Sequence, residues 1–181
     1  MTVFISGGAK NGKSSLAQSL AVKLAAGGRL YYVATMIPTD DEDRARIRRH
    51  VADREGLGFV TLERGRRILS CLEEADPDGT FLVDSVTALL MNEMFPPPYD
   101  GTVDENAPAR CADELVRFVR SVRNAVLVSD GIYSDAALYD RETERYRRGL
   151  AAVDRALAGA CDTAVEVCAG IPVVHKGGLL P

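Results

Sequence analysis

The chain has 181 residues, of which 46% are hydrophobic and 27% are charged, so its composition excludes intrinsic disorder as the default state. Its formal net charge of −4 gives no general attraction for nucleic acid or for an anionic membrane, and we expect neither as a partner. The length fits one compact domain, which we predict to span residues 1–181.

Five short apolar runs rich in β-branched residues predict buried strands. They are Val3–Ile5, Leu30–Val33, Phe81–Val83, Ala125–Val128 and Ala164–Val167. Segments with helical length and periodicity lie between these runs or next to them, at Ser14–Ala26, Asp41–Asp53, Arg64–Ala75, Val86–Met94, Arg110–Arg123 and Arg141–Ala160. This alternation predicts an α/β fold in which helices flank a mostly parallel central sheet.

A glycine-rich turn follows the first predicted strand and opens into an amphipathic helix. The turn reads Gly7-Gly8-Ala9-Lys10-Asn11-Gly12-Lys13-Ser14, which matches GxxxxGK[ST] in full. Backbone N–H groups in such a turn point at phosphate oxygens, and the helix N-terminus adds a partial positive charge. We therefore predict a P-loop in which Lys13 reaches the β- and γ-phosphates of a nucleotide and Ser14 binds Mg²⁺. A turn that only connects strand to helix is the alternative, and the match in this context disfavours it.

A stripe of basic residues surrounds one of the two histidines of the chain. Arg46, His50 and Arg54 are spaced four residues apart in a segment of helical periodicity, so they share one face. Flanking cations disfavour the protonated imidazole and leave a ring nitrogen available for attack on a phosphate. From the residues alone, the favoured interpretation is nevertheless a solvated helix, because acidic and basic residues are mixed along residues 40–49.

Two aspartates that follow predicted strands are candidates for the acidic group that holds Mg²⁺ or its water shell. Asp84 comes directly after Phe81–Val83, and Asp130 follows Ala125–Val128 after one residue. Because the carboxyl ends of parallel strands meet at one edge of a sheet, either carboxylate can lie near the P-loop. We favour Asp84, and a helix N-cap is the alternative role of each aspartate.

The remaining features bear on location and on flexible segments. Residues 1–6 lack the basic start and apolar core of a signal peptide, and no apolar run is long enough to span a membrane, so we expect a cytoplasmic protein. The four cysteines show no CxxC spacing, and we expect neither a disulfide nor a zinc site. Three prolines exclude a helix or a central strand at Pro96–Gly101, which predicts an exposed loop, either a substrate lid or a connector.

Several segments taken together resemble one known family. They are the P-loop, Ala34-Thr35, Arg46-Ile47 with His50, Arg54, Thr61 with Glu63, Leu82–Phe95 with Asn92 inside it, and Ala169–Pro172 with Lys176. The family is that of the bifunctional adenosylcobinamide kinases and adenosylcobinamide-phosphate guanylyltransferases of cobalamin biosynthesis, and the resemblance spans most of the chain. Where the family commonly has an Asn-Glu pair, this chain has Asp130-Gly131, and Asp154-Arg155 replaces a later pattern of asparagine and glutamine.

The resemblance implies a RecA-like P-loop NTPase subunit, usually in a homotrimer, that uses Mg²⁺, ATP and GTP. It implies two reactions: phosphorylation of a hydroxyl group of adenosylcobinamide, and transfer of GMP from GTP to adenosylcobinamide phosphate through a guanylyl-histidine. The family's histidine corresponds to His50, which makes the nucleophile its favoured role, whereas His175 matches no motif and is expected to be structural.

The predicted site follows from the motifs and the resemblance together. The catalytic residues are His50 and Lys13, and the metal ligands are Ser14 and Asp84. The nucleotide-binding residues are Gly7, Gly8, Ala9, Lys10, Asn11, Gly12, Lys13, Ser14, Thr35, Arg46, Arg54, Glu63 and Asp84.

Two other functions stay open from the sequence. The first is a single-activity P-loop kinase of another small hydroxylated metabolite, which the altered Asp130-Gly131 segment suggests. The second is a nucleotide-dependent switch that binds a protein partner through the loop at Pro96–Gly101.

Overall fold

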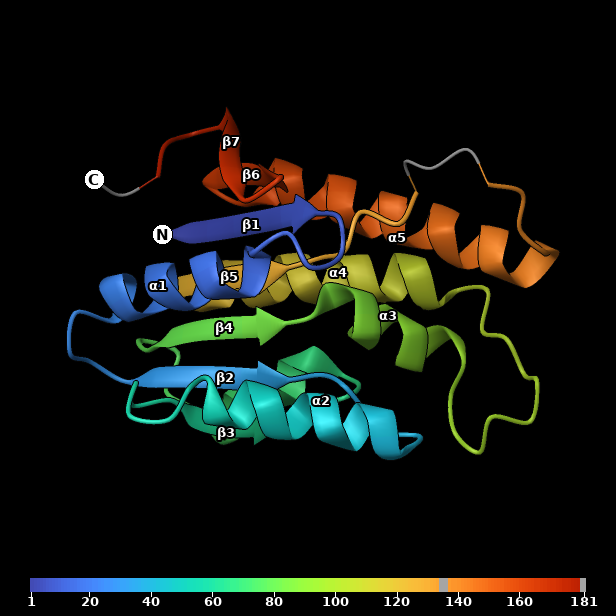
Figure 1. Cartoon of the computed structure of the whole chain (residues 1–181), viewed down its shortest axis with the longest axis horizontal. Coiled ribbons are helices and arrows are strands. Elements are labelled where there is room, and N and C mark those ends of the chain that lie inside the picture. Colours follow the sequence, from blue (N-terminus) through green and yellow to red (C-terminus); the bar gives the residue numbers. More distant parts are fainter. Residues whose placement is uncertain (134–136, 180–181) are drawn as a thin grey trace.

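The computed structural model describes residues 1–133 and 137–179, which form a seven-stranded sheet covered by helices (Figure 1). The strands are β1 (Thr2–Gly7), β2 (Leu30–Ala34), β3 (Val60–Glu63), β4 (Thr80–Asp84), β5 (Asn124–Val128), β6 (Thr163–Cys168) and β7 (Ile171–Lys176). Their order across the sheet is β3-β2-β4-β5-β1-β6-β7, and only β7 runs antiparallel to its neighbour among the described strands. The predicted α/β fold with a mostly parallel sheet is therefore confirmed.

Helices cover both faces of this sheet. They are α1 (Lys13–Ala25), α2 (Asp41–Ala52), the 3₁₀ helix η1 (Ile68–Glu73), α3 (Val86–Met94), α4 (Ala107–Ser121) and α5 (Arg141–Ala160). One core lies between the sheet and η1, α3, α4 and α5, and a second, smaller core lies under α1 (Figure 1). No helix in the described part of the chain is long and apolar enough to cross a membrane.

The central strands are buried on both faces, which explains why they read as continuous apolar runs rather than as an alternating pattern. In β1, Val3 and Ile5 belong to the core under α1, whereas Phe4 between them belongs to the larger core. In β2, Tyr31 points into the larger core and stacks on Phe81 with ring centroids 4.8 Å apart. The next residue in β2, Tyr32, therefore faces the opposite side of the sheet.

Two predicted helices differ from the structure for local reasons, and two strands were not predicted. The α-helix expected at Arg64–Ala75 is wrong: only η1 forms there, because Arg67 has a left-handed backbone with φ of 54° and blocks an earlier helical start. The helix expected at Arg110–Arg123 begins earlier, at Ala107, since proline is tolerated in a first helical turn. The strands β3 and β7 were not among the five predicted, since they are exposed edge strands without a buried apolar run.

The sheet brings the predicted site residues to one edge. The P-loop follows β1, Glu63 and Asp84 end β3 and β4, and Asp130 follows β5 after one residue. These strands are parallel and adjacent or nearly so, and the loops at their carboxyl ends therefore surround one region, where α/β proteins commonly bind ligands.

Candidate active site

The P-loop holds its lysine folded back toward the loop. Gly7 has φ of +146°, and a Cβ atom there would lie 2.4 Å from the carbonyl oxygen of Val167 on β6, so only glycine fits. The buried Lys13 Nζ donates a hydrogen bond to the carbonyl oxygen of Gly8 at 2.7 Å and forms an ion pair with Asp130 Oδ1 at 2.8 Å. The ammonium group thus lies inside the loop, where it can meet phosphate oxygens.

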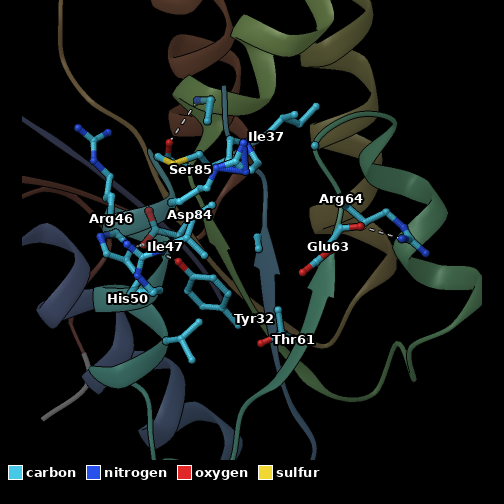
Figure 2. A pocket seen from close by; sticks show the side chains of 18 of the residues that line it. Tyr32, Ile37, Arg46, Ile47, His50, Thr61, Glu63, Arg64, Asp84 and Ser85 are labelled. Carbon is cyan, nitrogen blue, oxygen red and sulfur yellow. Dashed lines mark hydrogen bonds and ion pairs between the residues drawn. The ribbon is translucent and has the colours of Figure 1, made fainter. Parts of the chain in front are cut away.

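A cavity of about 610 Å³ opens between α2 and the carboxyl ends of β2, β3 and β4 (Figure 2). Helix α2 contributes Arg46 and His50 to its wall, and β3 contributes Thr61 and Glu63 from the opposite side. Apolar side chains of the segment after β2, including Ile37, complete the wall. A mixed cavity of this kind, with a few convergent polar groups, suits a small ligand such as a nucleoside.

Asp84 lies at the bottom of this cavity with its carboxylate directed at α2. Its Oδ2 accepts a hydrogen bond from the Tyr32 hydroxyl at 3.1 Å and lies 3.9 Å from Nδ1 of His50. Burial raises the pKa of the Asp84 carboxyl, and the neighbouring His50 and Tyr32 partly oppose this rise. The N-cap interpretation of Asp84 is wrong, because the Ser85 hydroxyl accepts the capping hydrogen bond of α3 from the Ala88 amide.

Arg54 presents an unsatisfied cationic group next to this carboxylate. Its guanidinium lies 3.3 Å above the ring of Tyr32, and only 7% of the residue is exposed. Its Nη1 is buried and has no hydrogen-bond partner in the described part of the chain. Because a buried donor without a partner is costly, this nitrogen is suited to receive an anionic ligand. Arg46 and His50 on α2 and Arg54, which lies beyond the end of that helix, all line the cavity.

Helix α2 forms from local signals rather than from packing. Asp40 caps it by accepting a hydrogen bond from the Asp43 amide at 2.8 Å, and the Asp43 carboxylate accepts from the Thr39 amide at 3.0 Å. Acidic residues in the first turn and Arg49 in the last turn suit the helix dipole. No residue of α2 is buried, so the prediction of a solvated helix holds, although its inner face lines the cavity.

The structure does not bring the Thr35 side chain into the cavity. Thr35 is fully buried, and its hydroxyl accepts a hydrogen bond from the Ser85 amide and donates one to the Ser85 carbonyl. The side-chain amide of Asn92 donates to the carbonyl oxygens of Thr35 and Gly65 at 2.8 and 2.9 Å. These contacts hold the ends of β2 and β4 in place under the cavity.

The chain is similar to known proteins over nearly its whole length. Residues 3–175 match the family described as cobinamide kinase / cobinamide phosphate guanyltransferase. The chain belongs to this family. A bifunctional adenosylcobalamin biosynthesis protein, CobP of Pseudomonas aeruginosa, is 30% identical and is aligned over 98% of this chain and 98% of its own length. The CobU protein of Salmonella typhimurium is 29% identical, over 97% of this chain and 100% of its own length.

Solved structures of other proteins have a similar fold. The flagellar accessory protein FlaH of Methanocaldococcus jannaschii superposes with a TM-score of 0.54 at 13% identity, over 98% of this chain and 78% of its own. A KaiC-like protein of Pyrococcus horikoshii gives 0.51 at 12% identity, over 97% and 78% respectively. The resemblance of the sequence to the cobinamide kinase / guanyltransferase family and the P-loop NTPase fold are therefore both confirmed.

Sequence reasoning missed two groups of this cobinamide kinase / guanyltransferase family member. One is Tyr32. The only sequence feature that could have indicated it is its hydroxyl group, carried by an aromatic residue in a strand that ends at the site. The other is a buried cluster around Asp154 on α5, which is 3% exposed. Asp154 Oδ2 accepts hydrogen bonds from Ser129 at 2.9 Å and from Tyr133 at 3.0 Å, while Oδ1 is buried without a partner among the described residues.

Replacing Asp154 by asparagine is expected to stabilise the protein at alkaline pH. Burial raises the pKa of Asp154 to about 7, although the two hydrogen bonds oppose this rise. The unfolded state loses this proton near pH 4, before the folded state does, so the wild type loses stability as the pH rises from about 4 to 7. The variant escapes this loss, which amounts to about 4 kcal/mol above pH 7.

Denaturant unfolding of both proteins at pH 5 and pH 8 measures this difference. The gap between variant and wild type should be wider at pH 8 than at pH 5. A gap that does not change with pH would contradict a carboxyl group that keeps its proton to a higher pH in the folded protein than in the unfolded chain.

Proposed function

We propose that this chain phosphorylates adenosylcobinamide with a nucleoside triphosphate and transfers GMP from GTP to adenosylcobinamide phosphate through a guanylyl-His50 intermediate. Membership of the family and the bifunctional relatives support the two reactions over a single-activity kinase or a switch. The observation that carries the covalent step is the position of His50. Its imidazole lies on the cavity wall with Nδ1 toward Asp84, so Nε2 is the nitrogen available for attack.

In this proposal, the P-loop and the cavity bind different parts of the nucleotide. The backbone of residues 7–14 and the Lys13 ammonium bind the β- and γ-phosphates, and the nucleoside occupies the cavity. Glu63 supports a preference for guanine, because a carboxylate accepts hydrogen bonds from the N1–H and the 2-amino group on one edge of that base. Adenine offers no such pair of donors there. Thr61 and Glu63 line the wall opposite α2.

Guanylyl transfer then takes two displacements at the α-phosphorus. Nε2 of His50 attacks, the P–N bond forms, and the bond to the bridging oxygen breaks as pyrophosphate leaves. Lys13, Arg46 and Arg54 stabilise the charge on the leaving group. An oxygen of adenosylcobinamide phosphate next attacks the same phosphorus, the P–N bond breaks, and His50 returns to its neutral form with adenosylcobinamide-GDP as the product.

The donor groups near the P-loop fit a magnesium ion. Mg²⁺ takes one or two protein oxygens when phosphate and water supply the others, and we assign these to Ser14 and Asp84. Within residues 1–133 and 137–179, no three or more His, Cys, Asp or Glu side chains are grouped so that they could hold a metal ion. When bound, Mg²⁺ neutralises phosphate charge.

Two further proposals rest on the family resemblance and the substrates. We propose that the subunits assemble as a homotrimer, as the family usually does. We also place the reactions in the cytoplasm, where the substrates ATP and GTP are abundant.

Incubation with Mg²⁺ and GTP labelled at the α-phosphorus tests the covalent step. We expect protein-bound label that resists alkali and is released by acid, as a phosphoramidate requires. GTP labelled at the γ-phosphorus should leave no such label, which distinguishes guanylylation from phosphorylation. GTP that binds without leaving any α-label on the protein would refute the guanylyl-histidine.

A further inference from the structure

A carboxylate outside the guanylyl-transfer residues lies next to the position of the transferable phosphate. Asp130 Oδ1 is 2.8 Å from Nζ of Lys13, the ammonium that contacts the β- and γ-phosphates in a P-loop. Asp130 therefore lies within a few ångströms of the place where the γ-phosphate binds. Asp84 lines the cavity beneath α2 with its Oδ2 3.9 Å from Nδ1 of His50, whereas Asp130 is not among the residues that line this cavity.

The backbone that carries Asp130 is fixed to the P-loop and to α3. The Asp130 amide donates to the Thr87 hydroxyl at 2.8 Å, and the Ser129 amide donates to the carbonyl oxygen of Ile5 at 2.9 Å. The Gly131 amide donates to the carbonyl oxygen of Gly7 at 3.0 Å. A group that exchanges a proton during phosphoryl transfer needs such fixed positioning relative to the phosphate.

The two carboxylates also differ in accessibility. The Asp84 side chain is 9% exposed, and its Oδ2 receives the Tyr32 hydroxyl. The Asp130 side chain is 38% exposed and forms its ion pair with a lysine that a bound phosphate attracts. When Lys13 turns toward the phosphates, Asp130 loses this partner at the surface where a second substrate can reach it.

We propose that Asp130 is the catalytic base of the kinase reaction. A carboxylate oxygen of Asp130 accepts the proton of the substrate hydroxyl as that oxygen attacks the γ-phosphorus. The new O–P bond forms, the bond from the γ-phosphorus to the β,γ-bridging oxygen breaks, and the nucleoside diphosphate leaves with the electron pair. This inference rests on the proposed function and adds the residue that activates the acceptor. Asparagine, which the family commonly has at this position, cannot take a proton, so this base is a feature of this chain and not of the family as a whole.

The variant Asp130→Asn separates this role from a structural one. Asparagine keeps the shape of the side chain but cannot take the proton, so kcat of adenosylcobinamide phosphorylation should fall about 100-fold or more. KM for the nucleotide should stay the same or decrease, because the variant no longer competes with phosphate for Lys13. Labelling of His50 by GTP should decline far less than the kinase rate, which also shows that the variant is folded.

A matched control and three adverse outcomes complete the test. Asp113→Asn alters an exposed aspartate that pairs with Arg117 on α4, and it should match the wild type in both reactions. A kinase kcat of Asp130→Asn within about threefold of wild type would overturn the inference alone. Parallel loss of both reactions with a higher Mg²⁺ requirement would overturn it in favour of a metal ligand. A wild type that labels His50 without phosphorylating adenosylcobinamide would refute the kinase half of the proposed function, and the inference with it.

Discussion

The variant His50→Ala is expected to lose GMP transfer to adenosylcobinamide phosphate by at least about 1,000-fold, because no nucleophile remains to form the covalent intermediate. Alanine removes the only imidazole on the cavity wall within the described residues. Phosphorylation of adenosylcobinamide should remain measurable, since transfer of the γ-phosphoryl group needs no covalent step at the histidine. The measurement is the formation of adenosylcobinamide-GDP together with the acid-labile label on the protein.

The other histidine supplies the matched control. His175 lies on the edge strand β7, exposed, with Nε2 3.0 Å from the Glu166 carboxylate on β6. His175→Ala should therefore transfer GMP at the wild-type rate. Transfer that persists in His50→Ala but disappears in His175→Ala would reverse the assignment of the nucleophile.

The variant Lys13→Met is expected to lower both reactions by at least about 100-fold, because both use a triphosphate whose charge the same ammonium stabilises. Methionine preserves much of the buried volume of the side chain but removes the charge, and it leaves Asp130 facing the phosphates without its cation. Initial rates of both reactions, at saturating nucleotide and Mg²⁺, measure the effect. The matched control is Lys23→Met, which alters an exposed lysine in the last turn of α1 and should change neither rate. Loss of only one reaction in Lys13→Met would show that the two reactions use different nucleotide positions.

Local patterns predicted the parts of the fold and site that depend on a few neighbouring residues. The P-loop could be predicted because its glycines and lysine lie within eight consecutive residues, 7–14. The spacing of Arg46 and His50 likewise put them on one face of a helix, and both line the cavity together with Arg54, which lies beyond the end of α2. In both cases the physical requirement, a turn of the backbone or one face of a helix, is satisfied within a single segment.

The contacts that the sequence did not predict join segments far apart in the chain. The ion pair of Lys13 with Asp130 depends on β5 lying next to β1, and the hydrogen bond of Tyr32 to Asp84 depends on β2 lying next to β4. The order of strands in a parallel sheet is set by the packing of all its helices, which no short pattern encodes. The left-handed backbone conformation of Arg67 could not be predicted either, because arginine carries no local sequence signal for that conformation.

The absence of buried residues in α2 has a thermodynamic consequence for substrate selection. A helix of 12 residues held mainly by its cap and its charges is only marginally stable on its own. Little free energy is therefore needed to displace it from its position over the cavity. If a nucleoside occupies the cavity as proposed, part of its binding free energy is used to fix this helix, so the affinity is lower than the contacts alone would give. A base that fills the cavity poorly leaves the nucleophile insufficiently positioned. Discrimination between nucleotides then occurs more strongly in the rate of covalent transfer than in binding.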